Sequence, residues 1–334
     1  MKRFSVAVWW LLPAIFLLAR PVDAQVANVP RVDTTDRAQV TSLYRLYYRP
    51  SAMVPHQWTG SVAAGTPGTL GGDYLRATLQ RINYYRAMSG QPGNVVFDAA
   101  ANARCQQAAL MMSAQRALSH TPARDWRFYT PIAAETAAHA NLDLDWRGDE
   151  GPGAIDRYMS DFGSENGCVG HRRWLLYNAA RVMGTGAIPA GGTGHPGANV
   201  TFIGGPAPCP ADAPPSAAWP PAGFVPAPLV YDRWSFSYAN ADFHMARVRV
   251  TKNGAPVAAQ REPVRFQTRP DGTGTIVGNN TVVWRLPGNV VSPTADETYR
   301  VQIDQVYIGG KCRQFDYLVT SIDPTGRAKL VAAR

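Results

Sequence analysis

Two histidines and several carboxylates in the middle of the chain are the residues best suited to chemistry. His120 follows one expected helix, His171 opens a later segment, and Glu135 and Asp161 lie between them. Two imidazoles with carboxylates are a donor set for zinc or another divalent ion, with water in an open position. The same groups suit a general acid and base around a bound substrate. From spacing alone a third interpretation is favoured, a polar cluster in which the acids simply hold the histidines, because two histidines and two acids over about fifty residues often occur by chance.

The stretch 153–177, GAIDRYMSDFGSENGCVGHRRWLLY, must position the second acid and the second histidine. Its first part has apolar residues at helical spacing, namely Ile155, Tyr158, Met159 and Phe162. Asp161 comes near the end of this stripe, a short polar loop with Glu165 follows, and His171 precedes an apolar run. We therefore expect two ordered segments joined by a tight loop to hold Asp161 and His171.

Other catalytic motifs do not occur in the sequence. We find no G-x-S-x-G elbow, no H-E-x-x-H, no P-loop and no dinucleotide fingerprint. The four cysteines are Cys105, Cys168, Cys209 and Cys312, and their spacing fits no zinc knuckle. In an exported chain an even number favours two disulfides, with three possible connectivities.

The first 24 residues have the pattern of a secretory signal. Lys2 and Arg3 precede an apolar run, and small residues at Val22-Asp23-Ala24 suit cleavage before Gln25. The run is short for a membrane anchor, and no later segment is long and apolar enough to span a bilayer. We expect a mature chain that is secreted, periplasmic or held in the cell envelope, without a stable membrane span.

The 334-residue chain carries a formal net charge of +9, but its basic residues are mostly arginines dispersed along the sequence. This distribution favours a basic soluble surface and not a nucleic-acid partner.

The periodicity of the chain changes from helical to strand-like after about residue 228. Helix patterns cover 74–88 and the segment that Asp98 would cap, and strands are expected at 181–188 and 199–203. This is an α+β pattern. Alternating apolar residues and an Asn253-Gly254 hairpin signal predict an immunoglobulin-like β-sandwich in the second half. The expected organisation is a signal peptide (1–24), an extended lead-in (25–72), a first domain (73–204), a proline-rich linker (205–228) and the β-sandwich (229–334).

Five sequence blocks together resemble the CAP superfamily, the cysteine-rich secretory, antigen 5 and pathogenesis-related 1 proteins, also called SCP domains. The blocks are LQRINYYR (79–86), LSH (118–120), AETA (134–137), DRYMSD (156–161) and GHRRW (170–174). They cover about 73–203, and the chain looks most like the bacterial secreted branch.

The resemblance implies an α-β-α sandwich with a central cleft that holds two histidines and two acids. They correspond to His120, His171, Glu135 and Asp161. Some members bind a divalent metal there, so His120 and His171 are candidate zinc ligands. The chain has Ala-Glu-Thr where the family usually has Gly-Glu-Asn, and Asp161 where many members have Glu, so Glu165 is an alternative second acid.

The resemblance also suggests a role for two residues of the first helix. Asn83 and Arg86 match a family pair that is structural and not catalytic, as a buried hydrogen-bonding pair. For the disulfides we expect Cys105–Cys168, which would tie the second helix to the loop before His171. We expect Cys209–Cys312 to fix the linker to the β-sandwich.

No single reaction follows from this resemblance. The first hypothesis is an exported protein that binds an unknown lipid, glycan or protein ligand in the cleft, with a β-sandwich that positions it. The alternative is a divalent-metal-dependent hydrolase with His120 and His171 as ligands and Glu135 as general base. A third hypothesis makes the β-sandwich adhesive and the CAP domain a spacer.

Overall fold

The computed structural model describes residues 25–192, 194–204, 209, 213–267, 278–288 and 291–325. The expected signal peptide, residues 1–24, lies outside the described residues. In the described part, no helix is long and apolar enough to cross a membrane.

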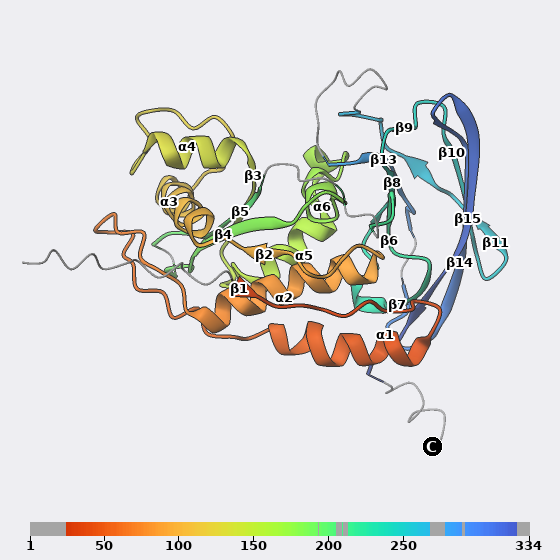
Figure 1. The fold of residues 1–334 in the computed structure, drawn as a ribbon, viewed down its shortest axis with the longest axis horizontal. Coiled ribbons are helices and arrows are strands. Elements are labelled where there is room, and N and C mark those ends of the chain that lie inside the picture. The colour runs from red at the N-terminus through yellow and green to blue at the C-terminus, as the bar shows by residue number, and fades with distance from the viewer. Residues whose placement is uncertain are drawn as a thin grey trace, which may run out of the picture.

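The first half of the chain builds a five-stranded sheet between two layers of helices. Its strands, in order, are β1 (Gln25–Val26), β2 (Val96–Phe97), β4 (Val182–Ile188), β5 (Gly197–Ile203) and β3 (Ala140–Asp145). Helices α3 (Ala99–Gln115) and α4 (Pro131–Ala138) cover one face (Figure 1). On the other face lie α2 (Gly72–Met88), α5 (Pro152–Ser160) and α6 (Gly170–Leu175), with a short 3-10 turn, η3 (Ser164–Asn166), before α6.

Each face of this sheet has its own hydrophobic core, because successive strand residues point to opposite faces. In β5, Ala198 and Val200 join the core under α3 and α4, whereas Ile203 joins the core of α2 and α5. Helix α3 approaches β4 closely, since a Cβ on Gly186 would lie 2.2 Å from the backbone nitrogen of Gln106. Asp98 caps α3 by accepting a hydrogen bond from Ala101 N at 2.7 Å, as the sequence predicted.

The second half forms two β-sheets that share one core. The first sheet is ordered β11 (Ala255–Val257), β10 (Arg247–Lys252), β14 (Glu297–Ile308), β15 (Lys311–Ile322) and β7 (Gly223–Pro226), with β9 (Ala241–Asp242) beside β14. The second is ordered β12 (Gln260–Arg261), β13 (Asn280–Arg285), β8 (Arg233–Tyr238) and β6 (Ser216–Trp219). Trp234 and Trp284 from one sheet pack with Val301 and Val319 from the other. The α+β class is therefore confirmed.

Two of the expected connecting segments are regular structure instead. The expected linker, 205–228, contains β6 and β7, which pair with β8 and β15, and a 3-10 turn, η4 (Ala227–Leu229), begins at its end. Pro226, the last residue of β7, is tolerated because β7 lies at a sheet edge. The expected extended lead-in, 25–72, contains α1 (Arg37–Leu43), a π-helical turn η1 (Tyr44–Tyr48) and η2 (Arg49–Ser51). Asp36 caps α1, a local signal that the sequence analysis missed.

A partly buried carboxylate joins this N-terminal helix to the CAP-like core and, through a tyrosine, to the second half. Asp156 on α5 accepts hydrogen bonds from Tyr85 Oη at 2.6 Å and Tyr48 Oη at 2.9 Å, and it pairs with the buried guanidinium of Arg81. Tyr85 Oη also lies 2.6 Å from Tyr231 Oη, just before β8. Three segments therefore meet at Asp156, and Tyr85 connects them to a fourth.

We predict that Asp156→Ala lowers the free energy of unfolding by about 3–5 kcal/mol, because Arg81 would stay buried without its counter-charge. Urea denaturation measures this. Asp73→Ala is the matched control, since Asp73 pairs with Arg76 at the surface and should change stability by about 1 kcal/mol or less. Equal effects of the two substitutions would contradict a special role for Asp156.

The structure contradicts the predicted disulfides, because all four cysteines are free. Cys105 is buried in the core on the α3 side of the sheet, whereas Cys168 lies in the loop before α6 on the other side. Cys209 lies against Asn178, and Cys312 begins the exposed hairpin strand β15. Pairing by sequence order failed because the sheet separates the first two thiols.

We predict four titratable thiols in the denatured protein and unequal reactivity in the native state. Exposed Cys209 and Cys312 should react with iodoacetamide first. Cys105 should react last, because burial raises its pKa to about 12. Peptide mass mapping at timed intervals tests this order, and a disulfide-linked peptide in the unreduced digest would refute the free-thiol state.

Candidate functional site: a histidine-lined cleft

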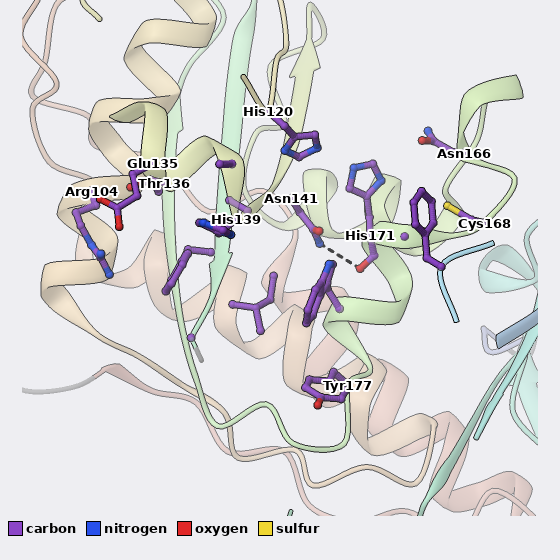
Figure 2. A pocket seen from close by; sticks show the side chains of 18 of the residues that line it. Arg104, His120, Glu135, Thr136, His139, Asn141, Asn166, Cys168, His171 and Tyr177 are labelled. Atoms are coloured by element: carbon purple, nitrogen blue, oxygen red, sulfur yellow. Dashed lines mark hydrogen bonds between the residues drawn. The ribbon is translucent and has the colours of Figure 1, made fainter. Parts of the chain in front are cut away.

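A cavity of about 820 Å³ lies among α4, β3 and α6 and contains the two predicted histidines (Figure 2). His120 follows α3, and His171 is the second residue of α6. A second, smaller cavity of about 320 Å³ also borders both histidines. The histidines therefore stand where two hollows of the surface meet.

His171 is held by a buried acid. Its Nδ1 lies 2.6 Å from Asp161 Oδ1, and the Asp161 side chain is 0% exposed whereas that of His171 is 22% exposed. Asp161 Oδ2 accepts a hydrogen bond from Arg172 N at 3.1 Å. A carboxylate can only accept here, so the Nδ1 of His171 carries a proton and its Nε2 remains for a ligand.

The backbone at Asp161 explains how a short acid reaches this histidine. Helix α5 ends at Asp161, whose φ of 50° and ψ of 44° are left-handed. Aspartate adopts this conformation more readily than most residues. The turn reverses the chain at the end of the helix, which directs the carboxylate toward the start of α6.

His120 is oriented by the backbone of α4. Its Nδ1 lies 2.7 Å from the carbonyl oxygen of Ala137, which can only accept, so Nδ1 is again the protonated nitrogen. The two imidazoles therefore have the same tautomeric arrangement, one fixed by a carboxylate and the other by a carbonyl. Both keep Nε2 free of these contacts, as in histidines whose ring orientation is set by a second group.

The two acids are not equivalent. Glu135 is exposed on α4, and Figure 2 shows its carboxylate beside Arg104 of α3, away from the histidine pair. Asp161 alone contacts an imidazole, so the structure brings together His120, His171 and Asp161 and leaves Glu135 at the other end of the cavity. Glu165 also borders the cavity but is exposed and accepts from Ser164 Oγ.

The cavity wall contains residues that sequence reasoning missed. Asn141 of β3 donates from Nδ2 to the carbonyl of His171 at 3.1 Å, and His139 lies at the end of α4 (Figure 2). His139 follows Glu135 by four residues, a helical spacing that could have indicated it. The aromatic residues of the lining are Trp174, Tyr177, Phe202 and Phe266. Phe266 comes from the β-sandwich half, so it carried no local signal.

The residues of the cleft do not form a complete metal site. Among the described residues, no group of three or more histidine, cysteine or acidic side chains is arranged to hold a metal ion. A catalytic zinc takes three protein ligands, and here Asp161 is committed to His171 and Arg172. The two imidazoles alone fall one ligand short.

Cys168 borders the same cavity as His171 but is not an activated thiol. Burial raises its pKa, an effect that nearby Arg173 only partly offsets. A thiol nucleophile needs a lowered pKa. The cleft therefore offers acid–base groups without an evident nucleophile among its described residues.

Asn83 and Arg86 on α2 each fix backbone and do not bond to each other. Asn83 bonds the backbone of Ala27 and, in both directions, of Val95. The Arg86 guanidinium donates to carbonyls at Pro92, Leu175, Tyr177 and Ala180. By this route α2 holds the end of α6, which carries His171.

The family comparison agrees with this geometry. Residues 79–203 match the model of CAP, the cysteine-rich secretory protein family. The chain carries a CAP domain. A comparison with curated proteins found no match. The matched range contains both histidines and Asp161, and the β-sandwich lies beyond it.

In this CAP domain we predict that Asp161→Asn lowers the pKa of His171 by about 1–3 units. Burial alone lowers that pKa, but the charge and hydrogen bond of Asp161, with a smaller effect of Asp143, raise it above the ordinary value. NMR titration of the imidazole measures this shift. Asp242→Asn, which alters the exposed pair with His244, should leave the pKa of His171 unchanged.

The same interaction gives a direction for stability. A folded-state pKa above the unfolded value of about 6.5 stabilises the protein fully below that pH. This contribution is lost as the pH rises through the folded pKa of His171. Wild-type unfolding free energies should therefore fall over this window, and Asp161→Asn should lack the fall; parallel pH profiles would contradict the assignment.

Proposed function

We propose that this is an exported CAP-domain protein that binds a ligand in the histidine-lined cleft, with the β-sandwich as part of the binding unit. The observation that carries the proposal is the fixed orientation of the two imidazoles at one cavity. His171 is held by Asp161, and His120 by the carbonyl of Ala137. Both imidazoles thus border a space large enough for a small organic molecule.

The lining indicates the chemistry of the ligand. Four aromatic side chains line the cavity, those of Trp174, Tyr177, Phe202 and Phe266. His171 supports a protonated state because its pKa is raised, so its Nε2–H can donate to an anionic or carbonyl oxygen. We therefore propose a ligand with an apolar or aromatic body and an acceptor group placed at the histidines.

We propose that 1-anilinonaphthalene-8-sulfonate, which combines an aromatic body with an anion, binds this cleft at pH 6. His120→Ala and His171→Ala should each weaken binding by about tenfold, because a charge-assisted hydrogen bond contributes about 1.5–3 kcal/mol. Fluorescence titration gives the Kd of each variant.

The matched control is His244→Ala. His244 also pairs with an aspartate, Asp242, but it is 66% exposed and lies on the β-sandwich outside the cleft. Its removal should leave the Kd unchanged. Wild-type affinity in both cleft variants would exclude the histidines from the binding site.

A metal-dependent hydrolase is the rival function, and the His171–Asp161 pair is the observation in its favour, because a carboxylate on Nδ1 orients an imidazole as a metal ligand through Nε2. We predict well below one zinc per chain in protein purified without chelator, since two imidazoles lack the third ligand. Elemental mass spectrometry checks this. Near-stoichiometric zinc that disappears in both His120→Ala and His171→Ala would instead support the hydrolase.

A further inference from the structure

The loop that carries Asp161 is held from outside the CAP domain. Arg233, the first residue of β8 in the second half of the chain, donates from Nη1 to the carbonyl of Asp161 at 2.5 Å. Its Nη2 donates to the carbonyl of Gly163 at 2.8 Å. The planar fork of arginine fits two carbonyls two residues apart, which a lysine ammonium cannot reproduce.

Arg233 is built into this position and is not a mobile surface group. Its side chain is 7% exposed, and its Nε faces Glu262 Oε1 at 3.4 Å. The acid offsets the buried positive charge. Removal of the guanidinium would leave two loop carbonyls and Glu262 without this partner.

Asp161 is thereby fixed from two sides. Its backbone carbonyl is bonded to Arg233, while its carboxylate bonds His171 Nδ1 and Arg172 N. The backbone of Asp161 has left-handed φ and ψ angles. A rotation about these bonds would move its carboxylate away from the imidazole. Arg233 acts at the point where such a rotation would begin.

The residues after His171 contact the same half of the chain. Arg172 donates from Nη1 to Ser235 Oγ on β8 at 2.9 Å, and Arg173 donates to the carbonyls of Asn279 and Phe266 at 3.0 and 2.7 Å. Successive residues of a helix point about 100° apart, so one short helix presents His171 to the cleft and both arginines to the β-sandwich. Burial lowers the pKa of each arginine to about 10. Since this value is still well above neutral pH, both arginines remain charged.

We propose that Arg233, and through it the β-sandwich, positions the Asp161–His171 pair of the CAP cleft. Arg233 is a positioning residue, since it touches the loop backbone and not the cavity. The inference rests on the proposed function only in treating His171 as part of the ligand site. It gives the β-sandwich a role inside the cleft itself, besides the wall residue Phe266.

The test is the Nδ1–H resonance of His171 in full-length protein labelled with ¹⁵N-histidine. A hydrogen bond to a buried carboxylate should give a downfield Nδ1–H signal that exchanges slowly with water, and His171→Gln identifies it by its loss. In Arg233→Met we expect the signal to vanish or to exchange with water at least tenfold faster. Arg233→Lys, which keeps the charge beside Glu262 and so preserves the fold, should show the same loss because it lacks the fork.

Arg37→Met is the matched control. Arg37 also links the first half of the chain to the second, through Asp296, but it does not touch the 161–163 loop. This variant should retain the slow signal. An unchanged His171 signal in both Arg233 variants, with a native amide spectrum, would overturn the proposal.

The titration with 1-anilinonaphthalene-8-sulfonate separates this inference from the proposed function. One outcome is loss of the Nδ1–H signal in the Arg233 variants while His120→Ala and His171→Ala bind the dye as tightly as the wild type. This would refute the binding proposal and support the positioning role. The opposite outcome is weaker dye binding in both histidine variants with an unchanged Nδ1–H signal in the Arg233 variants. This would support the binding proposal and refute the positioning role.

Discussion

The bond network around Asp156 is the constraint on which the arrangement of the molecule depends. One carboxylate receives two tyrosine hydroxyls and a buried guanidinium, and those donors come from the N-terminal helix and α2. A second hydroxyl contact extends the network to Tyr231 beside β8. An unpaired buried charge is costly, so an arrangement that separates Arg81 from Asp156 is disfavoured. Helix α5 is thereby fixed, and α5 ends at the acid of the cleft.

Buried charged side chains also form the hydrogen bonds around the cleft, but here the charged groups are donors and not an acceptor. Around Asp156 one acid collects several donors, whereas Arg172, Arg173 and Arg233 each distribute donors among backbone carbonyls and Ser235 Oγ. Backbone carbonyls have fixed places once the helices and strands are formed. Hydrogen bonds to them therefore fix the loop that carries Asp161 relative to these elements. The orientation of the His171 imidazole is well defined because the loop that carries its partner, Asp161, is held in place.

Local signals in the sequence predicted many of the helices and strands. They could not predict contacts between residues that lie far apart in the chain. Asp98 caps a helix by a bond three residues away, so its role is visible in the sequence. Asp161 and His171 are separated by ten residues and one loop, so their contact is close enough in the chain for a local pattern to indicate it. The position of Glu135 beside Arg104 depends on how α4 packs on α3, and no spacing rule contains that information. The disulfide prediction failed for the same reason, since the sheet that lies between Cys105 and Cys168 is assembled from distant strands.

The core of α2 and α5 also contains residues from near both ends of the described chain. Val29 and Val40 pack in the same cluster as Trp219, Leu229 and Ile322. A polypeptide emerges from the ribosome or a translocation pore N-terminus first, and domains with local cores can fold as they emerge. This core cannot be completed until the last long strand has appeared. This cluster therefore gains its full set of contacts only late in synthesis.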